Sequence, residues 1–152
     1  MEKESQTSGS VLIVDDNQDD IKLLTRELLL AEVRHPICSV RSGEQLFSYL
    51  KGEGEYHDRN RFPYPILVML DLRMSPRDGY EVLRWLRENP DYKTFQVLVV
   101  SVVEEQNKIT EAYRLGAKTF LRKPISRPAL IEALQGVGLF SQPESDLRSK
   151  QA

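Results

Sequence analysis

The sequence predicts an α/β fold, because short apolar runs alternate with stretches of helical character. Three runs, residues 11–14, 66–70 and 97–100, are apolar without a break, which is typical of strands covered on both faces and favours a parallel sheet. Two weaker candidates, residues 36–40 and 119–121, complete a set of five strands. Since crossovers between parallel strands are right-handed, five strand-then-helix units predict a doubly wound sheet with helices on both faces.

Helical spacing and capping residues place the helices between these strands. Apolar residues recur at three and four positions in the first and last connecting segments: Ile21, Leu24 and Leu28, then Leu130, Ala133, Leu134 and Val137. Side chains that cap helices stand at the expected starts: Asn17, Ser42 with Gln45, Asp78 with Glu81, and Ser126 with Pro128. Gly116 stands where the fourth helix should end.

One domain over residues 10–138 is expected, with a disordered polar tail at 1–9 and a polar C-terminal extension at 139–152. Only the segment between residues 52 and 65 interrupts the alternation. It has no helical period, and it exceeds the roughly two to six residues of an ordinary helix-to-strand connection.

Composition excludes several classes of protein. The 152 residues hold 21 Lys and Arg against 23 Asp and Glu, a net charge of −2, so we expect no direct nucleic-acid partner. The single cysteine, Cys38, excludes an internal disulfide framework. The polar N-terminus lacks the apolar segment of a secretory signal, and no apolar run approaches the roughly 20 residues of a membrane span. A cytoplasmic protein without a membrane partner is therefore expected.

Three carboxylates follow two of the predicted strands directly. Asp15 and Asp16 come after the first strand, and Asp71 comes after the third. Any one of them alone reads as an ordinary loop residue. If these strands are neighbours, however, all three converge at the sheet edge where ligands of doubly wound folds bind. Such a group repels itself unless a hard cation is present, and Mg²⁺ suits it because it needs few carboxylates and shares phosphate oxygens.

Two further strand ends carry polar groups suited to a phosphoryl ligand. Ser101 follows the fourth apolar run, and Lys123 follows the fifth strand. A hydroxyl donor and an ammonium directed at one point would stabilise a phosphorylated carboxylate. Each residue alone is an ordinary turn or surface residue, so the prediction depends on the combination.

Three segments resemble the signature of CheY-like response-regulator receiver domains. They are VLIVDDN at residues 11–17, LDLRM at 70–74 followed by Asp78 and Gly79, and LRKP at 121–124. The resemblance covers about residues 10–138. It implies a flavodoxin-like five-stranded parallel sheet of order 2-1-3-4-5 with five helices.

The resemblance also implies roles for the site residues. Asp71 would be the phosphoacceptor, and Asp16 would bind Mg²⁺ together with Asp71 and the backbone carbonyl of Arg73. Asp15 would act on the ion through a water molecule. Ser101 and Lys123 would bind phosphoryl oxygens, and Phe120 falls at the family's switch aromatic, although a plain core position explains it as well.

The function implied is that of a stand-alone response regulator in a two-component phosphorelay. It would accept a phosphoryl group from a sensor histidine kinase, or exchange it with a phosphotransfer protein. The signal would leave through a changed output face, formed by the fourth helix, the fifth strand and the fifth helix. Such a protein catalyses only its own phosphorylation and dephosphorylation, so it is not expected to be an enzyme in the usual sense.

The sequence departs from the family pattern near the site. The loop between Met74 and Gly79 carries Pro76 one place late, which predicts an altered turn and an intact site. Val102 and Val103 stand where a small residue normally follows the hydroxyl position. Two branched side chains there, with Arg73 near the opening, would hinder water, so we expect a slowly decaying phosphate.

The segment from Tyr49 to Tyr56 resembles small regulators that work with phytochrome-type sensor kinases. A kinase of that type is therefore one candidate partner. Since such relatives often dimerise through the output face, a homodimer is another, with Leu139 and Phe140 as contributing apolar residues.

Three other functions compete with this interpretation. An aspartyl phosphohydrolase would need a second acid two residues after Asp71, where this chain has Arg73. A flavodoxin-like carrier would need phosphate-binding donors in the first loop, where Asp15 and Asp16 would repel the ligand. The serious alternative is a receiver-fold module that binds proteins without being phosphorylated.

Overall fold

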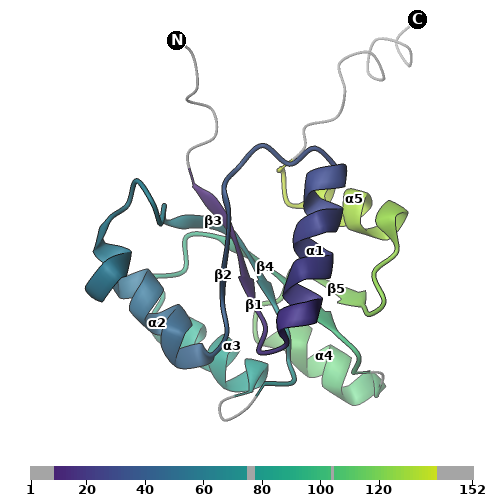
Figure 1. Ribbon diagram of the computed structural model, residues 1–152. Helices are drawn as coiled ribbons and strands as arrows, with labels where there is room; N and C mark the ends of the chain where they lie inside the picture. The colour runs from purple at the N-terminus through teal and green to yellow at the C-terminus, as the bar shows by residue number, and fades with distance from the viewer. Residues whose placement is uncertain (1–8, 75–77, 104, 140–152) are drawn as a thin grey trace, which may run out of the picture.

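Strands and helices alternate along the chain in the structure, a computed structural model that describes residues 9–74, 78–103 and 105–139. Figure 1 shows the arrangement. In chain order the elements are β1 (Ser10–Val14), α1 (Gln18–Leu30), β2 (Ile37–Val40), α2 (Gly43–Lys51), the 3₁₀ helix η2 (Gly54–His57), β3 (Pro65–Leu70), α3 (Gly79–Glu88), β4 (Gln96–Ser101), α4 (Gln106–Arg114), β5 (Thr119–Arg122) and α5 (Arg127–Gly136).

The strands form one parallel sheet of order β2-β1-β3-β4-β5, which confirms the predicted fold class and strand order. The register aligns the carboxyl ends of the two central strands, because Val14 pairs with Leu70. Leu70 pairs in turn with Val99 of β4, and Ser101 at the end of β4 pairs with Arg122. The residues that follow β1, β3 and β5 are therefore brought to one edge of the sheet.

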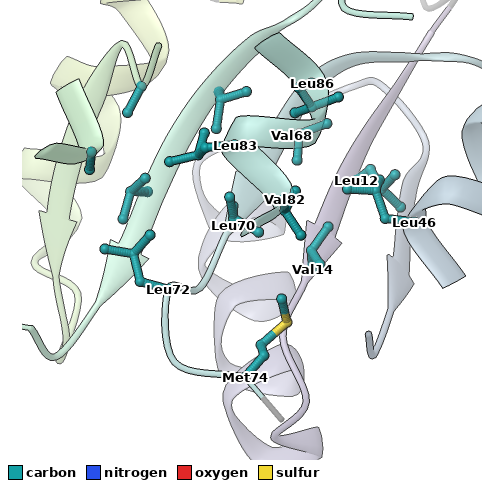
Figure 2. Close-up of a cluster of buried hydrophobic side chains, with 14 of the residues drawn as sticks. Leu12, Val14, Leu46, Val68, Leu70, Leu72, Met74, Val82, Leu83 and Leu86 are labelled. Atoms are coloured by element: carbon teal, nitrogen blue, oxygen red, sulfur yellow. The ribbon is translucent and has the colours of Figure 1, made fainter. Parts of the chain in front are cut away.

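Alternate residues of the central strands face opposite sides of the sheet, and each side is covered by helices. Leu12 and Val14 of β1 pack in one core cluster with residues of α2, α3 and α4, among them Leu46 and Leu83. Figure 2 shows part of this cluster. Val11 and Ile13 pack in the second core cluster, with α1 and α5. Strands covered on both faces explain why the sequence shows unbroken apolar runs.

The predicted caps are present at four helix starts. Each capping side chain accepts a hydrogen bond from the backbone N–H three residues later: Asn17 from Asp20, Ser42 from Gln45, Asp78 from Glu81, and Ser126 from Ala129. The capping box at Ser42 differs in one respect, since the Gln45 amide oxygen accepts from the N–H of Arg41 rather than of Ser42. Gly116 follows the end of α4 with φ +114°, as the stop signal predicted.

The segment between residues 52 and 65 contains the short helix η2, which its sequence did not predict. Arg59 ties this segment to the domain, because its guanidinium donates to the carbonyls of Leu50 and Phe62, each at 3.2 Å. The same guanidinium lies over the rings of Tyr49 and Tyr64. The insertion is therefore folded against the C-terminal end of α2.

Of the predicted end segments, only Gly9 and Leu139 are described. Leu139 is half-buried against the second core cluster, and Phe140, Pro76 and the rest of the predicted tails lie outside the described residues. None of the helices in the described ranges combines the length and the apolar character that crossing a membrane requires.

Gly79 supports a test of how the loop after β3 is built. A Cβ at this position would lie 2.6 Å from the carbonyl oxygen of Asp71 and 2.7 Å from the Cα of Leu72. Because both contacts are to backbone, Gly79→Ala should lower the free energy of unfolding by about 2 kcal/mol in urea denaturation. Gly136→Ala in α5 is the matched control, since no atom lies within 4 Å of its Cβ. Equal stability of the two variants would contradict the close approach.

Candidate functional site

The three carboxylates predicted to converge do so at the carboxyl edge of the sheet. Asp15, Asp16 and Asp71 each offer an oxygen within 4.8 Å of the others. Asp15 and Asp71 are buried, with 4% and 7% of their surface exposed, while Asp16 is half-buried. They meet because Asp15 and Asp71 each follow one member of the register pair Val14–Leu70.

Lys123 provides the positive charge among these acids. Its Nζ donates to Oδ2 of Asp15 at 2.8 Å, to Oδ2 of Asp20 at 2.8 Å and to Oδ2 of Asp71 at 3.3 Å. The side chain is only 15% exposed. Its backbone N–H donates to the carbonyl of Ser101, which fixes the start of the β5–α5 loop against the end of β4.

Backbone amides hold the second oxygen of both buried acids. Oδ1 of Asp15 accepts from the N–H of Asn17 at 2.9 Å, and Oδ1 of Asp71 accepts from the N–H of Arg73 at 3.1 Å. Each carboxylate is thus fixed by one amide and by Lys123. The Arg73 side chain is exposed, and the use of the Arg73 carbonyl as a metal ligand stays a prediction.

Burial and charge shift the acid–base properties of the site. Burial raises the pKa of Asp71, and this outweighs the opposing effects of Lys123 and of the Arg73 amide, while the charge of Asp15 adds to the rise. Burial alone would lower the pKa of Lys123, but the carboxylates of Asp15, Asp20 and Asp71 outweigh it and raise that pKa above its ordinary value. Lys123 therefore stays protonated. Burial makes the ionised form of Asp71 less favourable, and a further cation nearby would stabilise that form.

The donor set fits a magnesium ion. All three converging groups are carboxylates, which are hard oxygen ligands, and Mg²⁺ typically binds through one or two of them while keeping water. The single ammonium of Lys123 is shared by three carboxylates, those of Asp15, Asp20 and Asp71.

Ser101 lies at the end of β4 and is fully buried, and its Oγ accepts a long hydrogen bond from the N–H of Val103 at 3.4 Å. Of the two branched residues that follow it, Val102 is 47% exposed and Val103 only 3% exposed. The prediction that both crowd the opening is therefore wrong for Val103, which packs in the first core cluster. Val102 alone borders the opening.

Phe120 is half-buried and packs against the first core cluster. Its backbone N–H donates to the hydroxyl of Tyr113 on α4 at 3.1 Å. The predicted switch residue is thus joined through its backbone to a helix of the predicted output face. Its two interpretations, switch and plain core residue, both agree with this position.

A cavity of about 380 Å³ opens beside the carboxylates, between α1 and the loop after β5. Asp15 and Lys123 belong to its lining, most of which is apolar: Leu23, Leu24, Val100, Val102, Pro124 and Ile125. Asp20 and Glu27 of α1 complete the wall.

Asp20 is the site residue that sequence reasoning missed. It lies in the first turn of α1, and its carboxylate is as close to Lys123 as that of Asp15. A signal was available, because Asp20 stands four residues before Leu24 and eight before Leu28. An acid in line with two buried leucines must face the sheet edge rather than solvent.

Comparisons with known proteins agree with this geometry. The family model described as the response regulator receiver domain matches residues 11–135. The chain is 29% identical to response regulator Rcp1 of Synechocystis sp. over 140 residues, which covers 92% of this chain and 93% of that protein.

Solved structures with the same fold include phytochrome-associated regulators. Response regulator RPA3017 in red light signaling of R. palustris aligns with a TM-score of 0.72 and 34% identity, covering 84% of this chain and 90% of that one. The phosphorylated cyanobacterial phytochrome response regulator RcpA aligns with a TM-score of 0.69 and 31% identity, and the alignment covers 86% of this chain and 91% of that one. The Mn²⁺-bound form of Rcp1 aligns with a TM-score of 0.73 and 25% identity, and the alignment covers 89% of this chain and 97% of that one.

The raised pKa of Asp71 predicts the effect of neutralising it. An acid whose pKa is raised on folding destabilises the fold once the pH exceeds that pKa, and it has no such effect below its ordinary value. Without divalent cation, Asp71→Asn should therefore raise the free energy of unfolding at neutral pH by about 1 kcal/mol, a gain that fades toward about pH 3.

Thermal unfolding across this pH range measures the effect. Asp91→Asn, which removes an equal charge at an exposed position, is the control and should change little. A destabilised Asp71→Asn protein at neutral pH would mean that the bond to Lys123 outweighs burial.

Proposed function

Because the chain belongs to the response-regulator receiver domain family, we propose that it is a stand-alone response regulator that is phosphorylated on Asp71 by a sensor histidine kinase or a phosphotransfer protein. The observation that carries the proposal is the hydrogen-bonded group of Asp71, Asp15 and Lys123 beside Asp16. The stand-alone arrangement is supported by the alignment with Rcp1, of which this chain covers 93%.

In the proposed reaction a carboxylate oxygen of Asp71 attacks phosphorus in line with the bond to the donor. The new O–P bond makes an acyl phosphate, the P–N bond of the donor phosphohistidine breaks, and the imidazole takes up a proton. The amide of Arg73 holds the other oxygen of Asp71 in place. Lys123, already within hydrogen-bond distance of Asp71, neutralises charge on the phosphoryl oxygens. Hydrolysis by water later restores the carboxylate and ends the signal.

Asp16 and Asp71 would hold Mg²⁺ with the backbone carbonyl of Arg73, and Asp15 would bind it through water. The bound ion would neutralise charge on the phosphoryl group as it is transferred. The convergence of the three carboxylates supports this assignment, as does the similarity to a protein whose structure was solved with Mn²⁺.

The output would follow from Ser101 and Phe120. A phosphoryl group of charge near −2 attracts hydroxyl donors, so the Ser101 hydroxyl would leave the N–H of Val103 and turn to the phosphate. Phe120 would then turn inward. Because the backbone N–H of Phe120 donates a hydrogen bond to the hydroxyl of Tyr113, this rotation would shift α4 and alter the output face.

A phytochrome-type kinase is the partner we propose first. The support is the similarity to RPA3017 and RcpA, which are described as regulators of red light or phytochrome signalling. A homodimer through the output face and a cytoplasmic location are further parts of the proposal. The alternative, a receiver-fold module that acts without phosphorylation, would leave Asp71 unmodified.

Intact-mass analysis after incubation with acetyl phosphate separates these functions. We expect one added phosphoryl group on the wild-type protein, and none without Mg²⁺ or in Asp71→Asn. Asp91→Asn, an exposed acid outside the site, is the matched control and should be labelled as the wild type is. No adduct on the wild type, even from a cognate kinase, would favour the phosphorylation-independent module.

The lifetime of the acyl phosphate tests the role of Val102. Because its side chain borders the opening to Lys123 and Asp15, it should slow the approach of water, and the phosphate should decay over minutes rather than seconds. Val102→Ala should shorten the lifetime about threefold or more. Leu30→Ala, which truncates a comparably exposed apolar residue outside the site, is the control. Unchanged decay in Val102→Ala would exclude this role.

A further inference from the structure

Lys123 divides its hydrogen bonds unequally among three acids. An ammonium has three N–H donors, and here each has a carboxylate acceptor. The bonds to Asp15 and Asp20 measure 2.8 Å, and the bond to Asp71 measures 3.3 Å. The ammonium is thus bound more closely to the β1–α1 side of the site than to the acceptor Asp71.

Lys123 has other contacts in the site besides Asp20. The lysine is held by Asp15, by its backbone bond to Ser101 and by burial. Nor does the Asp20 side chain complete a capping box, because the N–H of Asn17 donates to Oδ1 of Asp15 instead. What the Asp20 carboxylate does is take one of the three ammonium donors and draw it toward α1.

Asp20 also adds negative charge beside Lys123. Its carboxylate is one-third exposed and lines the cavity beside Lys123. Together with Asp15 and Asp71 it places three carboxylates on the one ammonium of Lys123. A phosphodonor is an anion, so an extra acid at this position repels it and competes with its oxygens for Lys123.

We propose that Asp20 is a positioning residue that restrains Lys123, holding the ammonium toward α1 and so slowing phosphoryl transfer to Asp71. The proposal rests on the proposed function, since it concerns the rate of that reaction. It assigns a role to an acid on α1 outside the three carboxylates that converge on the cation site. In this protein the unphosphorylated state would be favoured by an ion pair that must yield before the lysine can bind a phosphoryl oxygen.

The rate of labelling by acetyl phosphate in saturating Mg²⁺ tests the proposal. Asp20→Asn keeps the size of the side chain and removes its charge, and we expect about a threefold to tenfold faster rate than wild type. The difference should narrow at high salt, because the charge effect is screened. Asp20→Glu keeps the charge and should stay near the wild-type rate, which a purely steric role would not predict.

Asp19→Asn is the matched control, since it removes an equal charge from the exposed neighbouring position in the same helical turn. It should leave the rate within about twofold of wild type. Thermal unfolding of each variant shows that the rates are compared between folded proteins.

The outcomes separate this inference from the proposed function. A labelled wild type with an unchanged or slower Asp20→Asn variant would overturn the restraint and leave the phosphoacceptor role of Asp71 intact. An equal gain in Asp19→Asn would reduce the effect to net charge and would overturn the specific role of Asp20. A wild type that takes no phosphoryl group would overturn both.

Discussion

The site depends on one buried ammonium. Lys123 lies among carboxylates that reach it from three separate segments: Asp15 after β1, Asp20 on α1 and Asp71 after β3. Without it, Asp15 and Asp71 would be two nearly buried like charges within a few ångströms, an arrangement that costs several kcal/mol unless a counter-ion is present. Lys123 is separated from these acids by 52 to 108 residues of sequence, so only the folded sheet can bring their charges to one cation. Folding and the assembly of the site are therefore one event.

The sheet register is what makes this convergence accurate. Val14 and Leu70 are paired, so Asp15 and Asp71, which follow them, lie at the same height along the sheet. The backbone amides of Asn17 and Arg73 each bind one oxygen of these acids. The chain then has to leave β3 without covering Asp71. Gly79 allows this, since its lack of a side chain lets α3 begin against the backbone of Asp71 and Leu72. The Arg73 amide and the Lys123 ammonium thus hold Asp71 in place.

Much of this could be predicted from the sequence, because the signals were local. Unbroken apolar runs indicated a parallel sheet, and acids directly after two of those runs indicated the converging carboxylates. The burial of Val103 was missed because it depends on the side of the sheet to which the side chain points, not on the type of residue. Val103 shares the parity of Val97 and Val99, whose side chains face the first core cluster, so continuing the strand period past Ser101 would have buried it. The helix η2 was missed because a single 3₁₀ turn has no apolar period to detect.

Asp20 was missed for a different reason, which bears on how the site works. Its importance comes from a contact with Lys123 across 103 residues of sequence. The helical spacing of Asp20 from Leu24 and Leu28 indicates the side that it faces, but it does not identify this partner. Yet this contact determines how the lysine's charge is distributed. Burial raises the pKa of Asp71 in spite of Lys123, whose ammonium also donates to Asp15 and Asp20. Closely spaced carboxylates attract a divalent cation and repel an anionic donor. In the proposed reaction cation binding would therefore come first, because it would offset the charge that repels the phosphoryl group.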